Sequence, residues 1–186
     1  MSNHLSTPAS AGSHAPISNP SRIEWHWSTF AALTPHALYA ILAARSAVFV
    51  IEQQCIYADI DGLDPLAWHL YGQDAAQPDT PLAACARVFA PDADDRTVRI
   101  GRVVSTSAYR GQGLGKALLE QAMLRIAEQW PQAPLRLHAQ AYLQAFYAGF
   151  GFEACSDVHL EDDIPHIWMQ RPSIDVQPYR AGARLG

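Results

Sequence analysis

The sequence has few cysteines, and none of them lies close to another along the chain. The three are Cys55, Cys85 and Cys155, an odd number without any Cys-x-x-Cys pair. Because structural zinc sites use closely spaced cysteine pairs, this spacing excludes a zinc site of that type, and we predict no metal. Isolated thiols are typical of proteins in a reducing compartment, which favours a cytoplasmic location.

Long apolar runs and a secretory leader are also missing. The first 21 residues are rich in Ser, Ala, Pro and Asn, and they lack the basic start and apolar stretch of a signal peptide. No apolar run reaches the roughly 20 residues that span a bilayer, so no membrane partner is expected. We predict a flexible N-terminal tail over residues 1–21, one domain over 22–172 and a C-terminal tail over 173–186.

Clustered positive charge is absent as well. The formal net charge is -5, and the 13 Lys and Arg residues form no long basic run. Because binding to a nucleic-acid backbone needs clustered basic side chains, no nucleic-acid partner is predicted. An acidic protein suits a cationic substrate somewhat better than an anionic one. The apolar share of 49% is that of an ordinary globular protein.

The sequence does contain a succession of short strand and helix patterns. Ile23, Trp25 and Trp27 alternate with polar residues, as in a half-buried strand, and Thr34 before Pro35 is a typical helix start. Further strands are predicted over residues 68–71, 82–89, 97–105, 135–139, 155–160 and 166–169, and helices over 34–49, 113–130 and 142–150. This order predicts an α/β fold, with a mixed sheet and helices on its faces.

A glycine-rich segment, Arg110-Gly111-Gln112-Gly113-Leu114-Gly115-Lys116, separates a predicted strand from a predicted helix. It does not match either of two common phosphate-binding loops. The P-loop requires glycine where Arg110 stands and Ser or Thr where Ala117 stands. The dinucleotide fingerprint requires a third glycine where Lys116 stands. Both of these nucleotide-binding interpretations therefore fail.

The position of the segment nevertheless favours anion binding. The N–H groups at the start of a helix have no partner within the helix, and they lie at the positive end of its dipole. Gly113 and Gly115 leave this backbone bare, while Arg110 and Lys116 add positive charge at its rim. The segment therefore predicts a phosphate site, with a plain structural turn as the alternative.

The segment also carries a resemblance to a known family. Residues 110–115 match the [QR]-x-x-G-x-[GA] signature of the GNAT superfamily of acyl-CoA N-acyltransferases. The chain resembles the ElaA-like branch over about residues 23–171, on segments 48–53, 59–64, 69–70, 139–140, 146–147, 151–152, 161–162 and 164–166. Two positions depart from that pattern. Asp163 stands where glycine is expected, and His159 stands near an expected tyrosine.

The resemblance implies a GNAT fold, in which a mixed, mostly antiparallel sheet splays open at the acyl-CoA cleft. Pantetheine then pairs with the backbone of the strand that ends at Ser105, and the pyrophosphate lies on N–H groups of the glycine-rich segment. If the site of Asp163 requires a positive φ, aspartate adopts it more readily than most residues. The residues expected to bind the cosubstrate acetyl-CoA are Val103, Val104, Ser105, Arg110, Gly111, Gln112, Gly113, Leu114, Gly115, Lys116, Gln140 and Tyr147.

The same resemblance implies direct transfer of an acetyl group from acetyl-CoA to an amine. Tyr147 matches the tyrosine that many members use as general acid, and the backbone N–H of Ser105 is the expected oxyanion donor. A lysine-like amine, with a pKa near ~10.4, must also lose a proton. The candidates for a base or water relay are Glu52, His138 and Glu161, with His69 and His166 as further candidates.

Acidic residues gather in two stretches, and they raise the question of a calcium site. Asp59-Ile60-Asp61-Gly62 lacks EF-hand spacing, since the glycine comes too early and the closing glutamate is missing. Most such acids are expected to be solvated loop residues, and the alternative is that they frame a cationic substrate site. The residues concerned are Asp59, Asp61, Asp64, Glu161, Asp162 and Asp163.

The resemblance leaves two functions open. An acetyl-CoA-dependent N-acetyltransferase acting on a small-molecule or peptide amine is the first, and a non-catalytic acyl-CoA-binding or sensing module is the second. Both would bind acyl-CoA through the same glycine-rich segment, so only turnover of an amine separates them. The identity of the amine is open, and the protein is expected to be a monomer or a homodimer.

Overall fold

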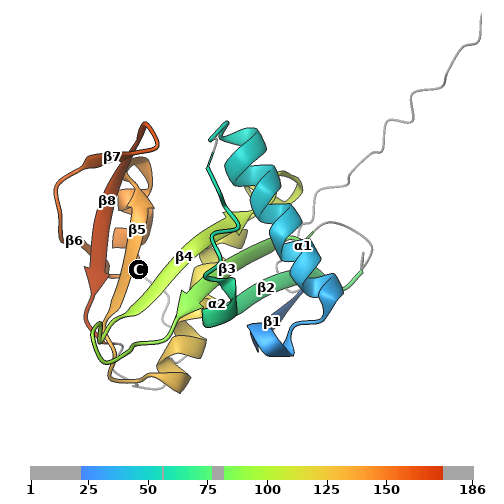
Figure 1. Ribbon diagram of the computed structural model, residues 1–186, viewed down its shortest axis with the longest axis horizontal. Helices are drawn as coiled ribbons and strands as arrows, with labels where there is room; N and C mark the ends of the chain where they lie inside the picture. Colours follow the sequence, from blue (N-terminus) through green and yellow to red (C-terminus); the bar gives the residue numbers. More distant parts are fainter. Residues whose placement is uncertain (1–21, 56, 77–81, 174–186) are drawn as a thin grey trace, which may run out of the picture.

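The computed structural model describes residues 22–55, 57–76 and 82–173, and the sheet that runs through them has eight strands (Figure 1). The two tails predicted at the chain ends, residues 1–21 and 174–186, lie outside the described residues. The strand order is β1-β2-β3-β4-β5-β8-β6, and β7 also pairs with β8. The strands are β1 (Ile23–Thr29), β2 (Trp68–Asp74), β3 (Ala84–Phe89), β4 (Val98–Ser105), β5 (Leu135–Gln140), β6 (Glu153–Ala154), β7 (His159–Glu161) and β8 (Ile164–Arg171).

Helix α1 (Pro35–Arg45) begins at the predicted capping residue. The hydroxyl oxygen of Thr34 accepts a hydrogen bond from the N–H of Ala37 at 3.1 Å, and Pro35 occupies the first helical position. The helix continues as a π-helical segment (Ser46–Glu52). Its side chains pack on one face of the sheet, where Ile41, Ala44 and Val48 form a cluster with Cys85 and Val104.

Helix α2 (Leu114–Gln129) covers the opposite face. Its residues Leu114, Leu118 and Ala122 pack with Ala84 and Ala86 of β3. These two alanines flank Cys85, which packs under α1, and successive side chains of a strand point to opposite faces. A mixed, mostly antiparallel sheet with helices on both faces is therefore confirmed.

The sheet splits between β4 and β5. These strands run parallel and pair only where Val98–Ile100 of β4 meets Leu135–Leu137 of β5. Toward the carboxyl end of β4 they diverge, as the two arms of the sheet in Figure 1 show. A register shift in the pairing of β3 with β4 lies at this point, and Arg102 has a φ of 51° there. Such a bulge bends the strand, which helps β4 to leave its neighbour.

Several predicted boundaries are wrong. Of the strand predicted over residues 155–160, only the end forms, as β7, and the short strand β6 lies before it. Between them the Ser156 hydroxyl accepts the N–H of Trp168 at 3.0 Å, where a ladder bond would form. The helix predicted over residues 142–150 is a 3-10 turn followed by α3 (Gln144–Ala148). The strand predicted over residues 68–71 extends to Asp74, where β2 pairs with β1.

The prediction that no apolar segment is long enough to span a membrane does not hold when length and composition alone are considered. The helical run Pro35–Glu52 is long and apolar enough for that. Part of this run belongs to the packed core, however, and its Arg45 is buried and ion-paired with Asp59 and Asp64. These contacts show that the apolar side chains of this helical run pack against one face of the sheet.

Candidate functional site

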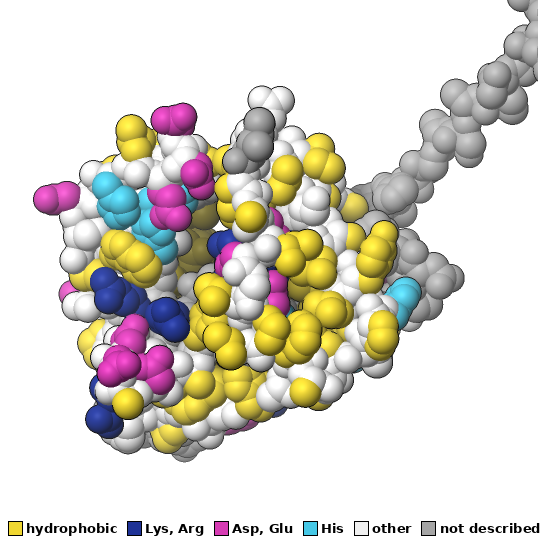
Figure 2. Space-filling view, viewed as in Figure 1, with side chains coloured by type: hydrophobic (Ala, Val, Ile, Leu, Met, Phe, Trp, Pro, Cys, Tyr) yellow, Lys and Arg dark blue, Asp and Glu magenta, His cyan; other side chains and the backbone are white. Residues whose placement is uncertain are grey.

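A cleft of about 790 Å³ lies where β4 and β5 diverge. The hollow is visible in Figure 2 between the arm that carries the histidines and the helix that covers the other arm. Of the residues predicted to bind the cosubstrate, seven line this cleft: Val103, Val104, Ser105, Arg110, Gly115, Gln140 and Tyr147. Gly111, Gln112, Gly113, Leu114 and Lys116 are not among the lining residues, although they belong to the same loop and helix start.

Ser105 presents its backbone to the cleft. The N–H of Thr106, the next residue, donates to the carbonyl of Ala83 at 3.0 Å. Because backbone polar groups alternate in direction along an antiparallel strand, those of Ser105 point away from β3 and toward the gap. β5 does not pair with β4 at this level, so the edge stays open. The side chain of Val104 lies in the core under α1, so the valine contributes packing there.

The glycine-rich segment forms a tight loop that ends at the first turn of α2. Gly111 has a φ of 74° and Gly113 a φ of 77°, in the left-handed region that favours glycine. Gly113 is the N-cap, so the N–H groups of the first helical residues have no acceptor within the helix. A Cβ atom added at Gly113 or Gly115 would meet no protein atom within 4 Å. The loop therefore offers bare, positively polarised backbone beside the cleft.

The two charged side chains of this loop differ in their surroundings. The guanidinium of Arg110 contacts the Glu52 carboxylate at 2.6 Å, and its Nε donates to the carbonyl of Ser105 at 2.9 Å. Lys116 is exposed and lies 3.8 Å from Glu120, four residues along α2. Arg110 therefore joins the loop to the open strand edge, and Glu52, a predicted base, is occupied by an ion pair.

Tyr147 comes from α3 and lies at the inner wall of the cleft. Its ring is buried and packs edge-on against Phe146 and Phe152, at centroid distances of 5.1 and 6.2 Å. Burial raises the pKa of its hydroxyl to about 12, so the group stays protonated at neutral pH. Within residues 22–55, 57–76 and 82–173 this hydroxyl has no hydrogen-bond partner. It is thus a free donor at the cleft wall.

Gln140 lines the cleft and joins two of its elements. Its side-chain amide donates to the side-chain oxygen of Gln53 at 3.1 Å, across 87 positions of sequence. Gln53 follows the π-helical segment, and both residues line the cleft. The sequence pattern singled out Gln140 but not Gln53, since nothing in a loop glutamine indicates a distant partner.

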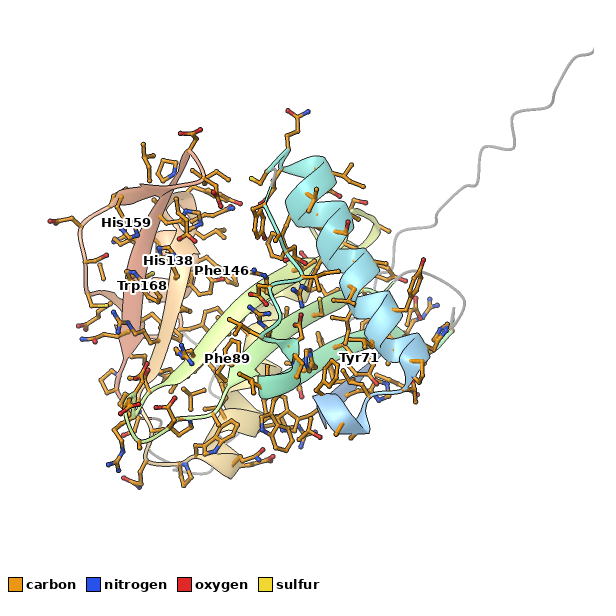
Figure 3. All side chains as sticks on the ribbon, viewed as in Figure 1. Tyr71, Phe89, His138, Phe146, His159 and Trp168 are labelled. Carbon is orange, nitrogen blue, oxygen red and sulfur yellow. The ribbon has the colours of Figure 1, made fainter. Side chains whose placement is uncertain are left out.

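The histidines gather on the other arm, where Figure 3 labels His138 and His159. The Nδ1 atom of His138, on β5, lies 2.8 Å from a carboxylate oxygen of Glu161, and its Nε2 lies 2.9 Å from Nε2 of His159. His166 and Trp168 of β8 pack against the His138 ring at 4.7 and 4.3 Å. Burial lowers the pKa of His138, which favours its neutral form at pH 7.

His69, a further candidate base, lies elsewhere. It is buried on β2, and its Nε2 is 3.1 Å from the backbone carbonyl of Asp64. Burial lowers its pKa, as expected for a histidine enclosed by the fold. It is not among the residues that line the cleft, and the expectation that it acts as base is wrong.

Two of the three aspartates in the loop before β2 are buried, whereas Asp61 is exposed. Asp59 and Asp64 are buried, and Arg45 of α1 contacts their carboxylates at 2.9 and 2.5 Å. Arg87 contacts Asp61 at 2.6 Å and Asp64 at 3.2 Å. The carboxylates are matched by these cations and by Arg102, whose Nε is 2.8 Å from Asp59. This set of residues is called the Arg–Asp network below.

The prediction that most of the acids are solvated is wrong for Asp59 and Asp64, which are buried, while Asp61 is exposed as expected. The hydrogen bond from Arg87 holds the pKa of Asp61 well below its usual range, so this carboxylate stays charged. Paired anions of this kind cannot attract a cationic substrate. Their position explains instead how the loop and the bulged residue Arg102 are fixed to the sheet that forms the cleft.

The acids of the second stretch form a tight turn. Asp162 and Asp163 have φ values of 50° and 62° and join β7 to β8 as a two-residue hairpin loop. Two positive φ angles are what the favoured hairpin turn requires. The position of Asp163 does need a positive φ, which explains why glycine is expected there.

Comparison with known proteins identifies relatives over most of the chain. The acetyltransferase (GNAT) domain family matches residues 79–172. Protein ElaA of Escherichia coli is 42% identical over 154 residues, which cover 82% of this chain and 98% of that protein. A UPF0039 protein of Synechocystis is 37% identical over 147 residues, covering 79% and 94%.

Solved structures of related proteins are similar to this chain over most of its length. An acyl-CoA N-acyltransferase from Pseudomonas aeruginosa superposes with a TM-score of 0.74 at 45% identity, over 80% of this chain and 99% of the other. The crystal structure of Escherichia coli ElaA superposes with a TM-score of 0.73 at 40% identity, over 80% and 99%. The match extends over nearly the whole length of these relatives.

Proposed function

Because the chain belongs to the GNAT acetyltransferase family, whose members bind acyl-CoA, we propose that it is an N-acetyltransferase that moves an acetyl group directly from acetyl-CoA to an amine. One observation carries the proposal. The open strand edge at Ser105, the bare start of α2 and the hydroxyl-bearing residue Tyr147 meet at one cleft. These groups match the three parts of the reaction: holding the thioester, holding the phosphates and assisting the thiolate.

Acetyl-CoA is proposed to lie along the gap between the strands. The pantetheine amides pair with the free backbone edge at Val103 and Ser105, as an added strand would. The carbonyl of Ser105 already accepts from Arg110, but a carbonyl oxygen has two lone pairs and can accept a second bond. The pyrophosphate lies on the N–H groups that begin α2, where Gly113 and Gly115 leave room. Gln140, which also lines the cleft, is the proposed contact to the pantetheine arm.

The thioester carbonyl must gain negative charge as the amine attacks. The backbone N–H of Ser105 faces the gap and is the proposed donor to that oxyanion. A backbone donor held by a strand needs no reorganisation during the reaction. Val103 and Val104 carry the same strand past the bulge at Arg102, which is fixed by its ion pairs with Asp59 and Asp61.

Tyr147 is proposed to assist the departing thiolate. Proton transfer from a hydroxyl with a pKa of about 12 to a thiolate, whose thiol has a reference pKa near ~8.5, costs about 5 kcal/mol. Full transfer ahead of bond cleavage is therefore unfavourable. The tyrosine instead donates a hydrogen bond to the sulfur as negative charge develops there, and it passes the proton on as the thiolate leaves.

The amine must lose a proton before it can attack. Presenting an amine of pKa ~10.4 in neutral form at pH 7 costs about 4.6 kcal/mol, so a base or an ordered water relay is useful. Of the three candidates, Glu52 is held by Arg110 at 2.6 Å. His138 and Glu161 lie together on the opposite arm of the cleft, which makes them the proposed base.

The location proposed for this chemistry is the cytoplasm. The three cysteines are free thiols, with Cys55 and Cys85 buried and Cys155 exposed, and this favours a reducing compartment. The acceptor is a small-molecule or peptide amine.

The function is tested by incubating the full chain with acetyl-CoA and a panel of amines, from polyamines to peptide amino groups, and measuring free CoA. We expect steady thiol release that depends on at least one amine. Binding of CoA in calorimetry without turnover of any amine would instead indicate an acyl-CoA-binding module. Competition of ATP with CoA for the cleft would indicate a nucleotide-binding protein.

A further inference from the structure

Two imidazole rings face each other through the same nitrogen: His138 lines the cleft, and the exposed His159 lies beside it. Nε2 of His138 and Nε2 of His159 lie 2.9 Å apart. The other nitrogen of each ring is also occupied: Nδ1 of His138 is 2.8 Å from the Glu161 carboxylate, and Nδ1 of His159 is 3.2 Å from the backbone carbonyl of Asp157. The chain of contacts therefore runs from Glu161 through both rings to Asp157. Figure 3 labels the two histidines.

Counting hydrogens shows what this arrangement needs. A carboxylate and a carbonyl only accept hydrogen bonds, so both Nδ1 atoms must carry a hydrogen. A neutral imidazole has a single N–H, and both Nε2 atoms would then present lone pairs to each other at 2.9 Å. One additional proton between them turns all three contacts into hydrogen bonds. All three hydrogen bonds therefore form only when the pair holds one proton more than two neutral histidines do.

A metal ion is the other cation that lone pairs could share. Two imidazole nitrogens at 2.0–2.1 Å from a tetrahedral zinc would be about 3.3 Å apart. The distance of 2.9 Å is the ordinary length of a hydrogen bond instead. Glu161 also approaches Nδ1 of His138, not the Nε2 that a shared ion would occupy. His138, His159 and Glu161 do lie close enough for a metal, so the experiment below includes this outcome.

We propose that His138 and His159 act as one unit, the proton acceptor for the amine substrate. The proposal rests on the N-acetyltransferase function proposed above. It replaces a single general base by two rings that share one proton, and it gives a role to His159, which stands near the position where the ElaA-like pattern has tyrosine. A tyrosine there can accept or donate a hydrogen bond, but it cannot hold the extra proton as a cation.

The step balances in atoms and charge. The ammonium of the substrate loses a proton to the pair at Nε2, and the freed lone pair of the amine forms a bond to the thioester carbon. The carbon–sulfur bond then breaks, and the thiolate receives a proton from the Tyr147 hydroxyl. The second proton of the nitrogen leaves as the amide forms and restores Tyr147. The pair releases its proton to water, so acetyl-CoA and an ammonium give an amide, CoA and one proton.

The surroundings of the pair set the pH at which it accepts a proton. Glu161, on β7, favours the cationic form, whereas His166 on β8 disfavours a second charge. Trp168 of β8 stacks on His138 at 4.3 Å, and Arg136 of β5 lies over the same indole at 4.6 Å. Burial is the largest influence and lowers the pKa of His138, and the neighbouring His166 and His159 lower it further, so the His138 ring favours its neutral, proton-accepting form at pH 7.

The test compares His159→Phe with the original protein in two measurements. His159 is exposed, so the variant keeps the fold, and His36→Phe changes another exposed histidine on α1 as the matched control. In the unsubstituted protein at saturating acetyl-CoA, kcat/KM for an amine identified in the panel should rise with pH, because the His138–His159 pair loses its shared proton and can then accept one from the amine. In His159→Phe we expect kcat/KM at pH 7 to fall by about 10²-fold, with recovery at high pH where free amine is abundant. CoA affinity should not change.

The second measurement needs no substrate. The imidazole nitrogens of the isotope-labelled protein are followed by NMR during a pH titration. His138 and His159 should take up one proton together in a single step, and His36→Phe should leave this step unchanged. Independent titration of the two rings, or an unchanged pH profile in His159→Phe, would overturn the proposal. Loss of activity with EDTA and its return with zinc would overturn it in favour of a metal site. Absence of turnover with every amine would contradict the proposed function, and the NMR titration would still decide whether the proton is shared.

Discussion

Two groups of ionisable residues lie on opposite sides of the cleft, and they differ in how their charges are matched. In the Arg–Asp network, Arg45, Arg87 and Arg102 contact Asp59, Asp61 and Asp64 at 2.5 to 3.3 Å, so three cations face three anions. In the histidine group, His138 and His159 face one another and Glu161, and one proton is needed to complete the contacts.

The difference shows how a structural ion cluster can be told from a reactive one. Buried carboxylates that are paired with arginines cost free energy to expose or to leave without those partners, so the Arg–Asp network fixes one arrangement of the loop against the sheet. A group that is one proton short, with His138 partly buried at a cleft and His159 and Glu161 exposed, can change its protonation at little structural cost. Residue type alone does not separate the two, since both contain acids and basic side chains in comparable number.

The largest expected effect comes from breaking the Arg–Asp network. Arg45→Met leaves the buried carboxylates of Asp59 and Asp64 without their main partner. We expect the free energy of unfolding to fall by roughly 3–5 kcal/mol, as for other buried ion pairs that lose one member. Denaturant titration measures it. Arg125→Met, which removes one member of the exposed pair with Glu128, should change it by less than about 0.5 kcal/mol. Equal small losses in both variants would contradict a structural role.

On the cleft side, Tyr147→Phe should slow turnover by roughly 10²–10⁴-fold, the range for general acid catalysis. The lower end is expected, because a pKa of about 12 makes full proton transfer costly and a thiolate is a tolerable leaving group. Acetyl-CoA affinity should change much less. The comparison is made by saturation kinetics against Tyr39→Phe, an exposed tyrosine of α1. An unchanged kcat, with chemistry rate-limiting, would remove Tyr147 from the reaction.

Two glycines with the same backbone conformation, one at the start of α2 and one in the loop of the Arg–Asp network, allow a matched test of the phosphate site. Gly113 and Gly62 both have a φ of 77°, and a Cβ at either position meets nothing within 4 Å. Valine in this conformation costs roughly 1–2 kcal/mol of stability at both sites. Only Gly113→Val should weaken CoA binding, by about tenfold or more, because its side chain enters the proposed pyrophosphate space. Calorimetry on folded protein checks this, and equal CoA affinity in both variants would move the phosphates elsewhere.

The smallest effect is expected from the N-terminal residues, which belong to neither region. Deletion of residues 1–21 should shift the melting temperature by less than about 2 °C and leave CoA affinity unchanged, since this segment has no apolar periodicity. Thermal unfolding of the shortened chain measures it. A loss of several degrees would show that the segment packs on the domain or across an interface.

The parts of the fold that depend on local chemistry could be predicted from sequence. The cap at Thr34, the helix start at Gly113 and the strand over 82–89, which the structure has as Ala84–Phe89, follow from neighbouring residues alone. The location of the cleft between two strands follows from the family resemblance, because spacing does not state that β4 and β5 separate after Ile100.

The ion-pair partners of the charged side chains could not be predicted from the sequence. Arg87 and Asp61 are 26 positions apart, and Arg102 and Asp61 are 41 apart, so no local pattern links them. A loop rich in aspartate looks solvated until the distant arginines are placed. His138 and His159, 21 positions apart, meet for the same reason only in the folded chain, through the pairing of both β5 and β7 with β8.

The proposal that the cleft transfers an acetyl group, and does not merely bind acyl-CoA, is tested most directly by following isotope-labelled acetyl. The full chain is incubated with acetyl-CoA labelled in the acetyl group and with the amine selected by the panel, and both products are quantified by mass spectrometry. We expect one labelled amide for each free CoA, formed at a rate that Tyr147→Phe lowers. Free CoA without a labelled amide, or tight CoA binding without either product for any amine, would contradict the proposed reaction.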